Sequence, residues 1–132
     1  MKIILITLSM LLYGCASKPV KLENAKRINL KSGSRYSKES DKKNASIVII
    51  RDSGAGGGLC AVDISIDSHT VASLNTSDYI EIFVKPGNYF LGAKHQCQGI
   101  LTEEDINIKT KEKQQFRVQI GGQSPISILR TK

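Results

Sequence analysis

The chain has 132 residues with 19 basic and 12 acidic side chains, which gives a formal net charge of +7. This length suits one domain. Such a charge is common in nucleic-acid-binding proteins, but its distribution argues against that class. Residues 16–44 carry nine basic and three acidic residues, whereas residues 45–132 carry nine of each. The predicted globular part is therefore neutral, and we expect no nucleic acid partner.

The first fourteen residues have the order of a secretory signal. Lys2 supplies a positive start, residues 3–12 form an apolar run, and Gly14 is a small residue at the cleavage position. A transmembrane helix needs about 20 apolar residues, roughly twice the length of this run. Residues 1–14 are therefore predicted to be a signal peptide.

The sequence Leu12-Tyr13-Gly14-Cys15 resembles a bacterial lipobox. The resemblance implies cleavage before Cys15 and acylation of that cysteine. Tyr13 departs from the pattern, since Ala, Ser or Thr is usual at its position. In Gram-negative lipoproteins an Asp after the cysteine commonly marks retention at the inner membrane, and this chain has Ala16 instead. The resemblance thus implies a lipid anchor in the outer membrane, with the domain facing the periplasm.

Residues 15–44 are predicted to be the lipidated cysteine followed by a flexible basic tether. The segment has few apolar side chains and no regular period, so it cannot bury enough surface to offset its ordering entropy. A flexible chain of this length spans roughly 30 Å. Residues 20–30 also allow a transient helix or a docked edge strand.

The basic side chains of the tether are candidate contacts for anionic lipid head groups. The alternative is that they only keep a linker soluble and extended. The residues proposed for head-group contact are Lys18, Lys21, Lys26, Arg27 and Lys31.

From Ala45 onward the apolar residues recur with a period of two, which is typical of half-buried strands. Eight short strands are predicted, over residues 46–52, 60–67, 70–74, 78–84, 89–98, 104–108, 115–120 and 126–129. Lys85-Pro86-Gly87-Asn88 is predicted to be a type II turn. Because no amphipathic helix separates the strands, residues 45–132 are predicted to form an all-β, antiparallel β-sandwich of about seven or eight strands.

The chain has three cysteines, and we expect them to have two different roles. Acylation of Cys15 leaves Cys60 and Cys97, which we expect to form a disulfide in an oxidising compartment. The chain has no Cys-x-x-Cys motif and no cluster of metal ligands, so a redox or metal role is not favoured.

Val84-Lys85-Pro86-Gly87-Asn88-Tyr89, with the strands on either side, resembles the PEGA-like domains found on bacterial lipoproteins. The similarity covers about residues 46–120. It implies a sandwich of the immunoglobulin or transthyretin-like kind, and it brings no catalytic residue and no cofactor.

The residue patterns do not favour catalysis. The glycine-rich loop at residues 54–58 lacks the Gly-Lys-Ser/Thr ending and the helix of a phosphate loop. Asp67-Ser68-His69 contains the residue types of a hydrolase, but neighbours in a tight turn cannot aim at one another. Asp63, Ser65 and Asp67 share a strand face but lack the Gly and Glu of a calcium loop. We predict no catalytic, cofactor-binding or metal-binding residues.

These observations favour a lipid-anchored envelope protein that binds or scaffolds an unidentified envelope component without enzymatic activity. Two alternatives stay open. One is an inhibitor or immunity-type lipoprotein that caps a periplasmic enzyme, and the other is an accessory lipoprotein of a secretion machine.

Overall fold

The computed structural model describes residues 17–54, 60–121 and 126–132. The predicted signal peptide, Cys15, most of the glycine-rich loop and Gly122 lie outside the described residues. The described elements are β1 (Ser17–Lys18), η1 (Leu22–Asn24), β2 (Lys26–Arg27), β3 (Ala45–Arg51), β4 (Ser53–Gly54), β5 (Val62–Ile66), β6 (His69–Leu74), β7 (Asp78–Val84), β8 (Gly87–His95), β9 (Leu101–Ile108), β10 (Lys113–Ile120) and β11 (Ile126–Arg130).

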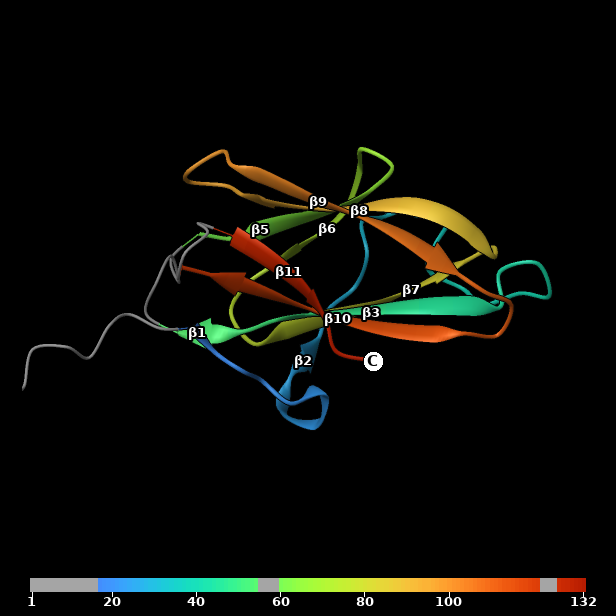
Figure 1. Cartoon of the computed structure of the whole chain (residues 1–132), viewed down its shortest axis with the longest axis horizontal. Coiled ribbons are helices and arrows are strands. Elements are labelled where there is room, and N and C mark those ends of the chain that lie inside the picture. The colour runs from blue at the N-terminus through green and yellow to red at the C-terminus, as the bar shows by residue number, and fades with distance from the viewer. Residues whose placement is uncertain (1–16, 55–59, 122–125) are drawn as a thin grey trace, which may run out of the picture.

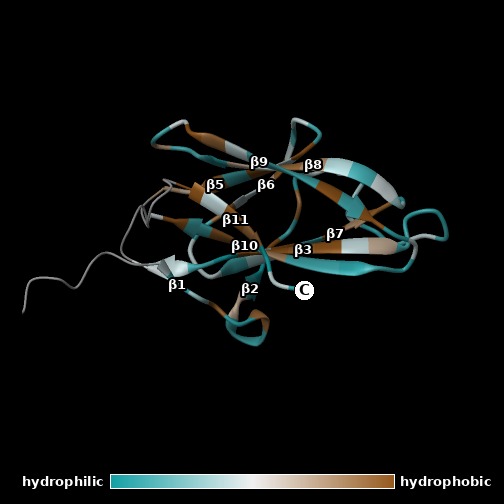
Figure 2. Ribbon diagram, in the orientation of Figure 1, coloured by the Kyte–Doolittle hydropathy of each residue, from teal (hydrophilic) through white to brown (hydrophobic). Residues whose placement is uncertain are grey.

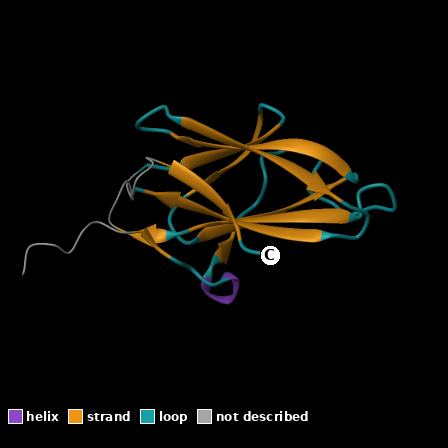
Figure 3. Cartoon of the chain, in the orientation of Figure 1, coloured by secondary structure: helices purple, strands orange, loops and turns teal. Residues whose placement is uncertain are grey.

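Two sheets face each other, so the predicted β-sandwich is confirmed (Figure 1). One sheet has the order β11-β10-β3-β7-β2, the other has the order β6-β5-β8-β9, and β1 and β4 form a separate short pair. Six of the eight strand pairs are antiparallel. The exceptions are β3 with β10 and β2 with β7, which are parallel. The only helical turn in the described residues is η1 (Figure 3).

The eight strands predicted from residue 46 onward all exist, with ends that shift by a few residues. Asp67 and Ser68 have φ values of 47° and 68°, which fits the two-residue turn of a β-hairpin between β5 and β6. The predicted type II turn differs from the structure. Gly87 has a φ of 155° rather than about 80°, because the chain passes there from β7 in one sheet to β8 in the other.

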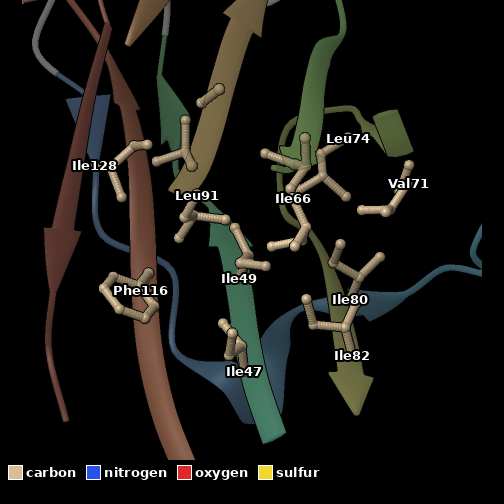
Figure 4. Packing of buried hydrophobic residues seen from close by; sticks show 14 of the residues in the cluster. Ile47, Ile49, Ile66, Val71, Leu74, Ile80, Ile82, Leu91, Phe116 and Ile128 are labelled. Carbon is tan, nitrogen blue, oxygen red and sulfur yellow. The ribbon is translucent and has the colours of Figure 1, made fainter. Parts of the chain in front are cut away.

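The core lies between the two sheets and is almost entirely aliphatic. Figure 4 shows side chains from both sheets meeting there, among them Ile49 from β3, Leu91 from β8 and Phe116 from β10. Hydrophobic residues lie mainly in the strands, whereas the connecting loops are mostly hydrophilic (Figure 2). Burial of the inward-facing side chains thus explains the period of two in the sequence.

Strand β3 is buried along its whole length. Ile47 and Ile49 belong to the central core, whereas Val48 and Ile50 point to the opposite face of the sheet and are equally inaccessible. An open antiparallel sheet usually has one face in water. Here the outer face of the sheet must therefore also be covered.

Residues 17–36, which we call the N-terminal strap, run along this sheet, and residues 19–23 lie on its outer face beside Gln115 and Arg117. β1 pairs with β4 at the end of β3, and β2 adds to the free edge of β7. Beyond β2 the strap follows the open side of the sandwich. Its backbone hydrogen bonds there run from Ile28 N to Tyr79 O (3.0 Å), from Lys31 N to Val71 O (2.9 Å) and from Phe83 N to Tyr36 O (2.9 Å).

The strap has more structure than a flexible tether would have, and it includes the docked edge strand that residues 20–30 allowed. Ile28 and Leu30 pack against the central core, and Tyr36 is buried within it. The entropy argument for a tether considered only the surface that the segment can bury by itself. A few apolar side chains are sufficient when they add to a core that the rest of the chain has already built.

Limited proteolysis tests the strap. We expect trypsin to cut the native protein after Lys38 and Lys42, which lie in an exposed loop, before it cuts after Lys26 or Arg27 in β2. Tyr36→Ala removes a buried aromatic ring, a change that costs about 3 kcal/mol in cores, and should accelerate cleavage in β2 by about tenfold or more. The control is Ser37→Ala at an exposed neighbour. Equal cleavage rates at all four sites in the native protein would contradict a docked strap.

Candidate functional site

The strap is fastened to the sandwich through the buried carboxylate of Asp52, which also forms an ion pair. Arg117 of β10 reaches Asp52, just after β3, with Nε at 3.1 and 3.2 Å from the two carboxylate oxygens and Nη2 at 2.5 Å from Oδ2. The Asp52 side chain is fully buried and that of Arg117 is 20% exposed. Asp52 Oδ1 also accepts the backbone N–H of Val20 at 3.2 Å. One carboxylate thus joins β3, β10 and the strap.

The ion pair has an electrostatic effect on its arginine. The hydrogen bonds that Arg117 donates to Asp52 favour the charged guanidinium and raise the pKa of Arg117, against the smaller opposing effect of burial. A two-pronged arrangement also fixes the orientation of the guanidinium plane. Arg117 therefore presents a fixed positive charge beside the strap.

A shallow groove of about 490 Å³ lies between the strap and the outer face of β10. Arg117 and Gln115 line one side, and residues 19–23 of the strap line the other. In the parallel register Gln115 is opposite Val48 and Arg117 is opposite Ile50. The groove thus lies on the sheet face to which the two buried β3 side chains point.

The basic side chains of residues 16–44 are on the surface. Those proposed for head-group contact, Lys18, Lys21, Lys26, Arg27 and Lys31, are all exposed, as are Arg35, Lys38 and Lys42. Within the described ranges, none of these eight side chains forms an ion pair with the sandwich. Arg35 instead lies over the ring of Tyr36, with its guanidinium carbon 5.3 Å from the ring centre. Their charge therefore remains available to an external partner.

The predicted disulfide between Cys60 and Cys97 is present, with the two Cα atoms 5.9 Å apart. It joins the start of the β5 segment to the turn after β8. With a sequence separation of 37, the chain-entropy model gives a stabilisation of about 4 kcal/mol. The bond therefore fixes this turn against the sandwich.

The buried side chain of Arg51 supports the region around the disulfide. Arg51, the last residue of β3, donates from Nη1 to the carbonyl oxygens of Cys60 and Leu74, each at 2.7 Å. Burial lowers its pKa, and the nearby charge of Asp78 partly offsets this effect. Arg51 thus ties β3 to the disulfide and to the end of β6. We call this end of the sandwich, formed by residues 51–54, 60–62 and 95–101, the disulfide end.

The other residue sets examined in the sequence have structural partners of their own. His69 Nδ1 lies 2.9 Å from the carbonyl oxygen of Asp67, within their shared turn. Asp63 accepts hydrogen bonds from Ser73 (2.5 Å) and Gln96 (2.9 Å), and Asp67 accepts one from the Phe90 N–H (2.9 Å). The Asp63, Ser65 and Asp67 side chains are thus not converged on one point.

His95 is buried, and its Nδ1 accepts the N–H of Gln98 at 3.2 Å. It shapes the turn that carries Cys97. Among residues 17–54, 60–121 and 126–132, no group of three or more His, Cys, Asp or Glu side chains is placed to hold a metal ion. No helix in that part of the chain is long and apolar enough to cross a membrane.

Sequence reasoning missed Asp52, Arg117 and Arg51. A signal for two of them was available, because Arg51-Asp52 directly follows the apolar run Ile47–Ile50. Charges that continue a buried strand need partners, and these must come from elsewhere in the chain. Nothing local in the sequence identifies Arg117 as that partner.

Comparison with known proteins gives no family assignment. No protein-family model matches the chain, and no curated protein matches it significantly.

The Asp52–Arg117 pair should matter more to stability than an exposed pair of the same kind. Arg117→Met leaves a fully buried carboxylate without its cation and should lower the free energy of unfolding by about 2–3 kcal/mol. The matched control is Arg130→Met, because Arg130 Nη2 is 3.3 Å from Glu112 Oε1 and both side chains are partly exposed, at 55% and 29%. This substitution should change the free energy of unfolding by less than about 1 kcal/mol. Denaturant unfolding measures both, and equal losses would contradict the assigned role of Asp52.

Proposed function

We propose that this protein is a lipoprotein anchored in the outer membrane through Cys15, whose β-sandwich binds or scaffolds another component of the cell envelope without enzymatic activity. The observation that carries the proposal is the Leu12–Cys15 lipobox placed directly before a folded domain. A PEGA-like sandwich, a class found on bacterial lipoproteins, is consistent with it.

The structure supports this proposal in two ways. The disulfide between Cys60 and Cys97 suits an oxidising compartment, as expected for an exported chain. The exposed basic side chains of the strap are close to the proposed acylation site in sequence, where anionic head groups would be within reach. Each contributes up to about 1 kcal/mol near an anionic surface, and salt weakens this attraction.

Membrane attachment through Cys15 is tested by fractionation. The native protein should sediment with membranes, and Cys15→Ser should be found in the soluble periplasmic fraction. Globomycin, which blocks lipoprotein signal cleavage, should cause the larger precursor to accumulate. Ser17→Ala is the control and should fractionate like the native protein. Membrane association of Cys15→Ser at the native level would reject the lipid anchor.

The sorting residue gives a separate test of location. Ala16→Asp should shift the protein from outer-membrane to inner-membrane fractions on a density gradient, and Ala16→Ser should not. If the native protein already sediments with the inner membrane, the outer-membrane assignment fails while the anchor stands.

The second candidate, an inhibitor of a periplasmic enzyme, is favoured by one surface feature. Phe90 of β8 has 53% of its surface exposed, and exposed aromatic side chains are enriched where proteins bind one another. A photo-crosslinking residue at position 90 should capture a partner in intact cells, with exposed position 113 in β10 of the other sheet as the control. A captured hydrolase that purified protein inhibits would support the inhibitor, and a non-enzymatic partner would support the scaffold.

A further inference from the structure

The N-terminal strap begins at the disulfide end of the sandwich. β3 ends there at Arg51, and Ser17 of β1 pairs with Gly54 of β4 immediately beyond it. β5 starts and β8 finishes at the same end, because Val62 is paired with His95. Figure 1 shows β1 and the turn between β8 and β9 at the same end of the molecule.

This start leaves very little chain between the proposed lipid and the fold. Only Ala16 lies between Cys15 and Ser17, and two steps along an extended chain span at most about 7 Å. A flexible tether of residues 15–44 would instead allow roughly 30 Å. An acyl group on Cys15 would therefore keep the disulfide end at the bilayer surface.

The same end carries adjacent exposed apolar side chains. Ile100 is 40% exposed and Leu101 is 50% exposed, in the turn that leads into β9. The other large apolar residues that are exposed in the described ranges, Phe90 and Leu129, are isolated from each other in sequence. Neighbouring apolar side chains on a turn form a small surface that can enter the interfacial region of a bilayer.

The turn is held rigidly before any contact is made. Cys97 is bonded to Cys60, His95 N donates to Ile100 O at 3.1 Å, and Gln96 N donates to Ala61 O at 3.0 Å. Contact with a membrane would thus order few additional groups, so little conformational entropy is lost.

The exposed charge around this end is favourable for an anionic surface. Lys18, Lys26 and Lys94 are exposed. The nearby carboxylates of Asp52 and Asp78 are buried, that of Asp63 is half-buried, and each accepts hydrogen bonds from the protein. Two exposed carboxylates, Glu103 and Glu104, follow Leu101 in β9, so the three exposed lysines leave a small net positive charge around this end.

From these observations we infer that the disulfide end is a membrane-docking surface, which rests on the bilayer with Ile100 and Leu101 in the interfacial region and the lysines against anionic head groups. The inference rests on the proposed acylation of Cys15 and goes beyond it, because it fixes the orientation of the domain. The outer face of β8 around Phe90 would then remain free of the bilayer.

The chain has no tryptophan, so one introduced residue reports on its own surroundings. We would purify full-length acylated protein carrying Leu101→Trp and place it in vesicles of phosphatidylethanolamine and phosphatidylglycerol with brominated acyl chains. Bromine quenches tryptophan on contact, so docking predicts that Leu101→Trp loses at least half of its fluorescence relative to unbrominated vesicles. The control is Phe90→Trp, which replaces a similarly exposed residue near the other end of the sheet and should lose little.

The outcomes separate the docking surface from the anchor. Protein that floats with the vesicles while both tryptophans escape quenching, or are quenched equally, overturns the docking and leaves the anchor intact. Protein that fails to float overturns lipid attachment, and the docking with it. Lys18→Glu together with Lys26→Glu should reduce the quenching of Leu101→Trp, whereas Lys109→Glu together with Lys111→Glu, at the opposite end, should leave it unchanged.

Discussion

Burial of β3 on both faces is the constraint on which the rest of the structure depends. A strand whose seven residues are all inaccessible needs a core on one side and a cover on the other. The second sheet supplies the core, and the N-terminal strap lies on the side to which Val48 and Ile50 point. Asp52, directly after this strand, holds both Arg117 and the backbone of Val20. The basic segment is therefore part of the fold and not an appendage to it.

The strands could be predicted from the sequence because one face of each strand is buried, and burial leaves a period of two in the residues. The disulfide could be predicted from the expected oxidising compartment and the number of cysteines. Neither argument determines which strands become neighbours, and the parallel pair of β3 and β10 is not encoded in any local pattern. Sheet order results from contacts between residues distant in sequence, and a single sequence does not reveal these.

The strap also shows that local sequence does not reveal contacts between distant residues. Its composition is that of a linker, with nine basic residues and few apolar ones in residues 16–44. Composition measures what a segment can bury by itself, whereas Ile28, Leu30 and Tyr36 are buried by the remainder of the protein. The role of Arg117 could not be predicted from its neighbours in the sequence either, because its partner Asp52 lies 65 residues away in the chain. Charged residues that continue a buried strand, such as Arg51-Asp52, are the local sign that such distant partners exist.

The pairing of the strap with β7, and its hydrogen bond to Asp52, also have a consequence for the order of folding. If the chain is exported, as we propose, it emerges from its N-terminus and residues 17–36 leave the membrane first. Their partners at Tyr79 and Phe83, and Arg117 that holds Asp52, follow much later. Contacts this distant in sequence form slowly, since a long loop must close before they are made. In an exported chain, the first part of the domain to cross the membrane would thus be among the last to acquire its native contacts, and its many charges would keep it soluble during that interval.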